Sequence, residues 1–211
     1  LTVNVTDVRL LVKALRPMPE KYHGLTDVET RYRQRYVDLL ANQDSREVFR
    51  KRARTMASLR QFLEARDYLE IESPIMQAIP GGANAKPFIT HHHALGVDLY
   101  LRVAQELAIK RCLVGGFEKV YELNRNFRNE GLSTQHNPEF TMLEYNEAYK
   151  DFNDYMDLTE EMLREVAIDV TGSAVVNYQG TAIDFGKPFN RMTMAESVCE
   201  FNPGLTISDC I

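Results

Sequence analysis

The sequence predicts an α+β fold in which an antiparallel sheet is flanked by helices. Two strand-like segments, residues 117–128 and 139–149, are joined by the polar loop 129–138, an arrangement typical of an antiparallel pair. Apolar residues at helical spacing mark two amphipathic helices, over residues 45–66 and 155–170. The chain has 211 residues, 44% of them hydrophobic, which is enough to bury a core around these elements.

Composition narrows the class of protein. The chain carries 25 Lys and Arg against 30 Asp and Glu, a net charge of -5, which is ordinary for a globular protein. No apolar run approaches the roughly 20 residues of a membrane-spanning helix, and no secretion signal is present. Cys112, Cys199 and Cys210 form neither a zinc pattern nor a disulfide framework. We therefore expect a cytoplasmic protein with no membrane partner.

Charge is unevenly distributed along the chain. Residues 1–66 carry 14 Lys and Arg against 8 Asp and Glu, whereas residues 67–211 carry 11 and 22. A basic segment on an acidic remainder is compatible with a polyanionic partner. A solvated basic helix face explains the same pattern, so charge alone leaves both interpretations open.

The N-terminal part predicts one strand and a linker. Residues 1–15 alternate apolar and polar side chains, which is typical of a strand. Because one strand cannot form a domain, we expect it to be the last strand of a domain that lies upstream. Residues 16–24 contain two prolines and a glycine, which predict a linker.

The next segment predicts a helix, a strand and a glycine loop. The helix over residues 45–66 is expected to begin at a capping box formed by Asp44 and Glu47. Residues 68–74 predict a short strand that a proline ends. Residues 79–83 include two adjacent glycines, which suit either a tight turn or a close backbone approach to a ligand.

Further elements follow toward the C-terminus. Residues 88–90 and 99–103 are strand-like, and residues 105–114 predict a helix closed by two glycines. The helix over residues 155–170 is expected to end before Gly172, and residues 175–185 predict a hairpin around a Gln-Gly turn.

Period-two geometry sorts the two long strands into an apolar face and a polar face. The apolar face must pack on the core. The polar face suits either a solvated outer surface or a working surface. The apolar set is Leu123, Phe127, Leu143 and Tyr145, and the polar set is Glu122, Asn124, Asn126 and Arg128 with Phe140, Met142, Glu144 and Asn146.

The polar set and its loop carry residue types that suit a nucleotide. Arg128 can bond phosphate through two donors and keeps its charge. His136 can add a donor at a polyphosphate, and Phe140 can stack under a base. Glu106 and Glu144 suit a cation such as an ammonium group. Walker, G-x-G-x-x-G, H-E-x-x-H and G-x-S-x-G motifs are absent from the sequence, which weighs against P-loop, Rossmann, zincin and α/β-hydrolase folds.

One string resembles a known family. Phe127-Arg-Asn-Glu130, followed by His136-Asn-Pro-Glu-Phe-Thr-Met-Leu-Glu144, is similar to motif 2 of class II aminoacyl-tRNA synthetases, in particular the bacterial-type lysyl branch. Residues 68–74 resemble motif 1, residues 79–88 resemble the glycine loop beside the amino-acid pocket, and residues 21–38 resemble the approach to the catalytic domain.

The resemblance implies a class II catalytic core that is incomplete at the C-terminus, because motif 3 is expected beyond residue 211. Residues 1–16 would be the last strand of an OB-fold anticodon-binding domain, residues 17–43 a linker, and residues 44–211 a partial catalytic domain. Motif 1 and Pro74 would build a homodimer interface.

The resemblance also implies an ATP site. Arg128 would be the catalytic residue, holding the α-phosphate of ATP and the carboxylate of lysine. Glu130 would contact the adenine amino group and Phe140 would stack on the ring. His136 and Asn137 would approach the distal phosphates. Mg²⁺ is expected, with its ligands beyond residue 211 and no metal site in the residues present.

A lysine site is implied beside it. Gly82, Glu106 and Glu144 would receive the ammonium groups of lysine, and Arg128 its carboxylate. The sequence departs from the family at two positions. Gln105 stands where the family commonly has proline, and Asn146 stands where it has a tyrosine that helps to hold the ε-ammonium group.

The implied function is that of a lysine-tRNA ligase. Such an enzyme activates L-lysine with ATP to lysyl-adenylate and transfers lysine to tRNA(Lys). A paralogue that lysylates a protein and a non-catalytic truncated fragment are the alternatives, and the strand expected at residues 1–15 favours the synthetase. The isolated 211-residue chain is expected to be inactive, since motif 3 would be missing.

Overall fold

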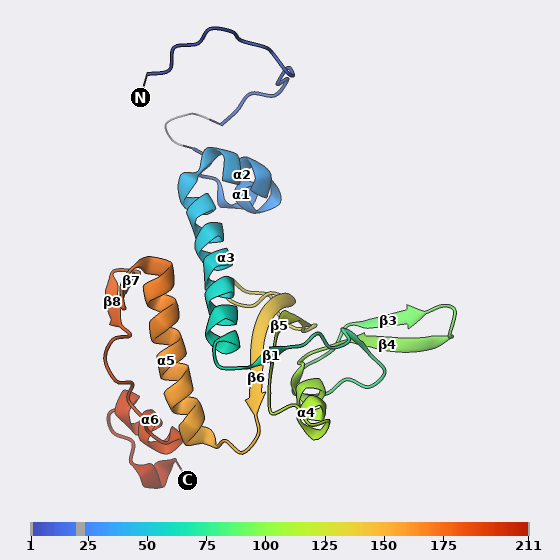
Figure 1. Ribbon diagram of the computed structural model, residues 1–211, viewed down its shortest axis with the longest axis vertical. Helices are drawn as coiled ribbons and strands as arrows, with labels where there is room; N and C mark the ends of the chain where they lie inside the picture. The colour runs from blue at the N-terminus through green and yellow to red at the C-terminus, as the bar shows by residue number, and fades with distance from the viewer. Residues whose placement is uncertain (1, 20–23, 211) are drawn as a thin grey trace. The chain divides into compact units, whose positions relative to one another are not determined.

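The predicted antiparallel pair forms two of the strands of a three-stranded sheet, as the computed structural model shows (Figure 1). Strand β5 (Lys119–Phe127) pairs antiparallel with β6 (Glu139–Glu147) and parallel with the short β1 (Leu69–Glu70). The structure describes residues 2–19 and 24–210. It divides into two compact units, residues 1–53 and 54–211.

In the first unit, the predicted strand at residues 1–15 is not formed. Residues 2–19 adopt no helix or strand, and apolar side chains such as Val3 and Val8 are exposed. A strand needs a neighbour to bond its backbone groups, and the described residues offer none here. The OB-fold assignment of residues 1–16 therefore stays a prediction. Residues 20–23 of the predicted linker lie outside the described residues.

Two short helices occupy the second half of the predicted linker 17–43, and its role as a linker stays a prediction. They are α1 (Val28–Arg33) and α2 (Arg35–Ala41). The cause is buried Asp38, whose carboxylate accepts hydrogen bonds from Arg31 Nε at 2.8 Å and Asn42 Nδ2 at 2.6 Å. Burial alone would raise the pKa of Asp38, but these bonds outweigh burial and lower it.

The long helix α3 (Gln43–Glu64) matches the helix predicted at residues 45–66. It begins slightly earlier than expected, so Asp44 lies in its first turn and not at the N-cap. The reason is local: α2 ends at Ala41 and Asn42 alone separates it from α3, so the chain passes from one helix to the next without the loop that a cap at Asp44 would need.

The core of the second unit lies on the apolar face of the sheet, as predicted. Leu123 stands directly opposite Leu143, and Tyr121 opposite Tyr145. The end of α3 and the helix α5 (Phe152–Thr171) cover this face. Burying each large apolar side chain stabilises the fold by roughly 1.5–3 kcal/mol. The buried cluster is Phe62, Leu63, Tyr68, Tyr121, Leu123, Met162 and Val166.

The predicted C-terminal end of α5 and the hairpin after it are confirmed, whereas α5 begins at Phe152 and not at the predicted residue 155. Asp151 caps α5 in a capping box, and Gly172 ends it with φ of 81°. Strands β7 (Val175–Tyr178) and β8 (Thr181–Asp184) pair through Gln179 and Gly180, both with positive φ, as a tight hairpin turn requires. The chain continues into α6 (Met194–Phe201) and the short 3-10 helix η1 (Ile207–Asp209).

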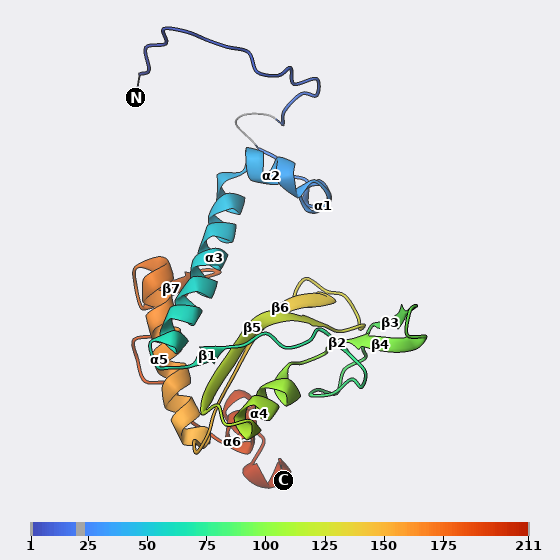
Figure 2. The same cartoon turned by 45° about the vertical axis from the view of Figure 1, so that its right-hand side comes forward.

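A smaller sheet and one helix lie toward the polar side of β5 and β6. Strand β4 (Val97–Leu101) pairs with β2 (Met76–Gln77) and β3 (Ile89–His92). Helix α4 (Glu106–Val114) packs against β5 and β6, on the side away from α3 and α5 (Figure 2). The predicted antiparallel sheets flanked by helices are therefore present.

Two expectations from composition can be compared with the described residues. Cys112, Cys199 and Cys210 are free thiols. None of the helices in residues 2–19 and 24–210 is long and apolar enough to cross a membrane.

Candidate active site

A cavity of about 250 Å³ lies where β5 ends and β6 begins. All five residues that the resemblance assigns to ATP line it, because the loop 129–138 folds back over the strand ends. The lining consists of Arg128, Glu130, Gly131, Gln135, His136, Asn137 and Phe140.

Arg128 and Phe140 form one wall of this cavity. The guanidinium carbon of Arg128 lies 5.2 Å from the centre of the Phe140 ring, a cation–π contact. The backbone N–H of Arg128 donates to the Pro138 carbonyl at 2.9 Å, which fixes where the side chain starts. Its Nε is buried without a hydrogen-bond partner among the described residues. A buried donor without a partner is available to an anionic ligand.

The opposite wall is held by contacts between loops. One carboxylate oxygen of Glu130 accepts from the Lys86 backbone N–H at 3.2 Å, and the Asn129 N–H donates to the Lys86 carbonyl at 2.8 Å. His136 Nδ1 lies 2.8 Å from Ser133 Oγ, within the same polar loop. These contacts tie the loop 129–138 to the segment after the glycine loop, so the cavity has a defined outline.

Three carboxylates gather further along the same face. Glu144 on β6 is directly opposite Glu122 on β5, and Glu106 starts α4 beside them. Burial raises the pKa of Glu144, and the negative charge of Glu106 raises it further, while Lys110 opposes the rise. Lys110 forms an ion pair with Glu106. A group of like charges of this kind favours a cationic ligand.

Gly82 lies against this group of carboxylates. Its φ is +89°, and a Cβ placed on it would come within 3.2 Å of the Ala104 Cβ and 3.5 Å of the Glu106 Cβ. The positive φ supports the tight turn, which needs glycine here, and the approach of this backbone to a ligand stays a prediction.

The remaining predicted residues are placed as follows. Asn146 is half-buried opposite Val120, on the same face as Glu144. Pro74 is exposed and lines a groove of about 310 Å³ together with Ile79 and other residues. The dimer role of Pro74 stays a prediction.

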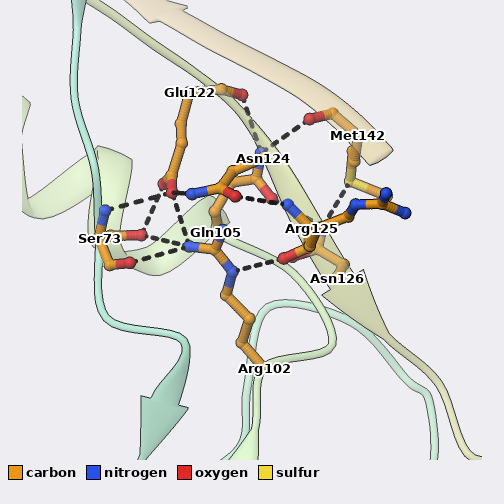
Figure 3. Close-up of polar contacts among 8 residues, drawn as sticks. All are labelled: Ser73, Arg102, Gln105, Glu122, Asn124, Arg125, Asn126 and Met142. Atoms are coloured by element: carbon orange, nitrogen blue, oxygen red, sulfur yellow. Dashed lines mark hydrogen bonds and ion pairs between the residues drawn. The ribbon is translucent and has the colours of Figure 1, made fainter. Parts of the chain in front are cut away.

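The polar face of β5 and β6 is partly buried and is not a solvated surface. The sequence did not predict which of its residues are buried. Glu122 is 1% exposed and Asn126 is 0% exposed, because Arg102 and Gln105 cover them (Figure 3). Arg102 Nη1 donates to Glu122 Oε1 at 2.7 Å, an ion pair that is closed to solvent. One feature of the sequence could have indicated this buried ion pair: a charged residue, Arg102, at the end of an apolar strand.

The carboxylates do not suit Mg²⁺. Among the described residues, no group of three or more His, Cys, Asp or Glu side chains is placed to hold a metal ion. Chemically, Arg102 already neutralises Glu122, and Lys110 already pairs with Glu106. A divalent cation bound by Glu122 and Glu106 would have to displace both Arg102 and Lys110.

Comparison with known families decides which fold family this site belongs to. Residues 27–205 match the family described as tRNA synthetases class II (D, K and N). The chain belongs to the class II tRNA synthetases. The match spans both helices that precede α3, the sheet and the whole candidate site of this class II synthetase chain.

Three curated relatives of this class II chain are each named lysine–tRNA ligase. The relative from Thioalkalivibrio sulfidiphilus is 62% identical over 206 residues, 98% of this chain and 41% of that protein. The relative from Aeromonas hydrophila is 57% identical over 99% of this chain and 42% of that protein. The relative from Histophilus somni is 58% identical over 95% and 40%. The chain thus spans about two fifths of the length of the curated relatives it matches.

Proposed function

We propose that this chain contributes the ATP and lysine sites of a lysine-tRNA ligase. The observation that carries the proposal is that the residues assigned to ATP meet around one cavity and continue, on the same strand face, into a group of carboxylates. Glu144 lies four positions after Phe140 on β6, about 13 Å at the rise of a strand. That length suits an adenosine followed by an amino acid.

The chemistry follows from the charges. A carboxylate oxygen of lysine attacks the α-phosphorus of ATP, the bond from that phosphorus to the bridging oxygen breaks, and pyrophosphate leaves. The main task for the protein is to hold two anions in line and to offset the charge between them. Arg128 suits this task because one guanidinium fork offers donors to both reactants. Glu106 and Glu144 then hold the ammonium groups of lysine, with the backbone of Gly82 beside them.

Several further parts of the proposal concern the whole protein. Glu130, His136, Asn137 and Phe140 hold ATP, which is a substrate, and Mg²⁺ accompanies it through ligands outside this chain. The second step transfers lysine to tRNA(Lys). The protein acts in the cytoplasm as a homodimer, with Pro74 at the interface and an OB-fold ahead of residue 17.

The test is amino-acid-dependent exchange of labelled pyrophosphate into ATP, measured on the protein expressed from its complete gene. Lysine is expected to support exchange, whereas aspartate and asparagine, the other amino acids of this family, are not. Charging of a tRNA, and not of a protein, then separates the ligase from the protein-lysylating alternative. Exchange with none of the three amino acids would contradict the proposal and favour a non-catalytic binding module.

A further inference from the structure

We propose that Gln105 is a positioning residue of the amino-acid pocket, whose buried amide fixes the start of α4 on the sheet and so sets Glu106 beside Glu144. The inference rests on the proposed function, in which these two carboxylates bind the ammonium groups of lysine.

The amide of Gln105 joins the two long strands β5 and β6. The side chain is 0% exposed. Its Nε2 donates to the Glu122 carbonyl on β5 at 2.9 Å and to the Met142 carbonyl on β6 at 3.2 Å. Its Oε1 accepts from Asn126 Nδ2 at 2.6 Å (Figure 3). Both donor hydrogens of the amide are therefore used, and the contacts reach the sheet at three points.

The backbone of Gln105 begins α4. Gln105 is the N-cap residue, and its carbonyl accepts from the N–H groups of Ala108 at 3.0 Å and Ile109 at 3.1 Å. Ile109 is itself fully buried. Glu106 follows as the first residue of the helix, so its position is determined by the residue that is bonded to the sheet.

Arg102 holds the other end of this short segment. Its Nη1 donates to Ser73 Oγ and to Glu122 Oε1, both at 2.7 Å, and its Nε donates to the Arg125 carbonyl at 2.9 Å. Val103 and Ala104, between the two anchors, are buried. Four consecutive residues are thus fixed, and Glu106 lies directly after them.

The two anchoring side chains, Arg102 and Gln105, differ in their effect on the charge of the neighbouring carboxylates. Arg102 neutralises Glu122, whereas the neutral amide of Gln105 adds no charge beside Glu106 and Glu144. The two donor hydrogens of the Gln105 amide meet two backbone carbonyls. Glutamate there would place an acceptor against these acceptors, and methionine would fill the volume but remove the two donors and the acceptor that Asn126 uses.

The experiment compares Gln105→Met and Gln105→Glu with Tyr68→Phe, in pyrophosphate exchange by the protein expressed from its complete gene. Tyr68→Phe is the matched control, because it removes a hydrogen bond to Glu147 Oε2 (2.8 Å) on the apolar side of the sheet. We expect Gln105→Met to raise the KM for lysine roughly tenfold, the effect of one lost hydrogen bond. The KM for ATP should stay within about twofold. Tyr68→Phe should lower the melting temperature and leave both KM values unchanged.

A second readout does not depend on activity. Glu106 raises the pKa of Glu144, so displacement of Glu106 in Gln105→Met should lower the pKa of Glu144 toward its ordinary value. The measurement is titration of the side-chain carboxyl carbon of Glu144 by NMR in the full 211-residue chain, with Glu106→Gln as the reference for complete loss of that charge.

The outcomes separate the two proposals. Absence of lysine-dependent exchange in the wild type contradicts the proposed function, and the titration then decides the inference alone. Equal increases in the KM for lysine and for ATP, or an unchanged pKa of Glu144 in Gln105→Met, would show that Gln105 only stabilises the fold.

Discussion

Glu122 and Glu144 stand directly opposite each other on the antiparallel strands β5 and β6, yet they have different partners. Glu122 is paired with buried Arg102 at 2.7 Å. Glu144 is half-buried, and burial together with the charges of Glu106 and Glu122 raises its pKa. One carboxylate of the facing pair therefore belongs to the structure, and the other is free to hold a cation.

The raised pKa of Glu144 gives a prediction for lysine binding as a function of pH. A bound ammonium group needs the ionised carboxylate, so lysine affinity should fall as the pH drops through the raised pKa of Glu144. The fall should begin at a higher pH than for an ordinary glutamate, whose pKa is about 4.3. Glu144→Gln should weaken lysine binding roughly 10–100-fold and remove this pH dependence. Calorimetric titration with lysine across the acidic range checks both.

The raised pKa of Glu144 also predicts how folding stability depends on pH. Ionisation of Glu144 favours lysine binding but lowers the free energy of unfolding. Because the pKa of Glu144 is higher in the folded state than in the unfolded chain, its ionisation costs stability once the pH rises through the folded-state value. Glu144→Gln should therefore increase the free energy of unfolding at neutral pH, and the gain should vanish below the pKa of the unfolded chain. Urea denaturation at both pH values measures it, and a variant less stable at neutral pH would contradict the assignment.

Arg128→Ala should separate binding from folding. Its guanidinium faces the cavity, with one donor left without a partner, so its loss should weaken ATP binding roughly 10–100-fold. The free energy of unfolding should change by less than about 1 kcal/mol, since only the contact with Phe140 is lost. Arg128→Lys should restore part of the affinity, because lysine keeps the positive charge. The recovery should be incomplete, because an ammonium group lacks the planar fork. Calorimetry with ATP and thermal denaturation check this. Parallel losses of affinity and melting temperature, with Arg128→Lys fully active, would indicate a structural role.

The ion pair of Arg102 and Glu122 should matter for folding. Both side chains are closed to solvent, and removal of one partner leaves the other charge buried. Arg102→Met or Glu122→Gln should each cost about 3–5 kcal/mol of unfolding free energy. The double variant should cost clearly less than the two single losses together, since it leaves no uncompensated charge. Chemical denaturation of the four proteins provides the cycle, and additive losses would refute the coupling.

Asn146→Tyr should tighten lysine binding. Asn146 lies on the same face as Glu144 and its amide is shorter than the tyrosine that the family carries there. A hydroxyl at this position adds one contact to an ammonium group, which corresponds to a roughly tenfold lower KM for lysine. The KM in pyrophosphate exchange with saturating ATP is the measurement. Asn146→Phe, which has the ring without the hydroxyl, is the control, and an unchanged or higher KM in Asn146→Tyr would sink the idea.

Local patterns in the sequence predicted the elements that depend on local physics. Alternation along residues 117–128 and 139–149 separated core from polar side chains, because successive residues of a strand point to opposite faces. The turn at Gln179 and Gly180 was equally readable, since few residues tolerate positive φ. The same reasoning failed for residues 1–15, where alternation was present but the described residues supply no strand to pair with it.

By itself, the sequence identified candidate residues for nucleotide chemistry, since Arg128, His136 and Phe140 have suitable groups on one strand pair and its loop. Only the tertiary structure decided which polar residues are closed to solvent. Ser73, Arg102 and Glu122 are far apart in the chain, and no periodicity within a segment reports that they meet. Burial of a polar face depends on what packs over it, and here the segment before α4 supplies both the covering atoms and the hydrogen bonds that make burial tolerable.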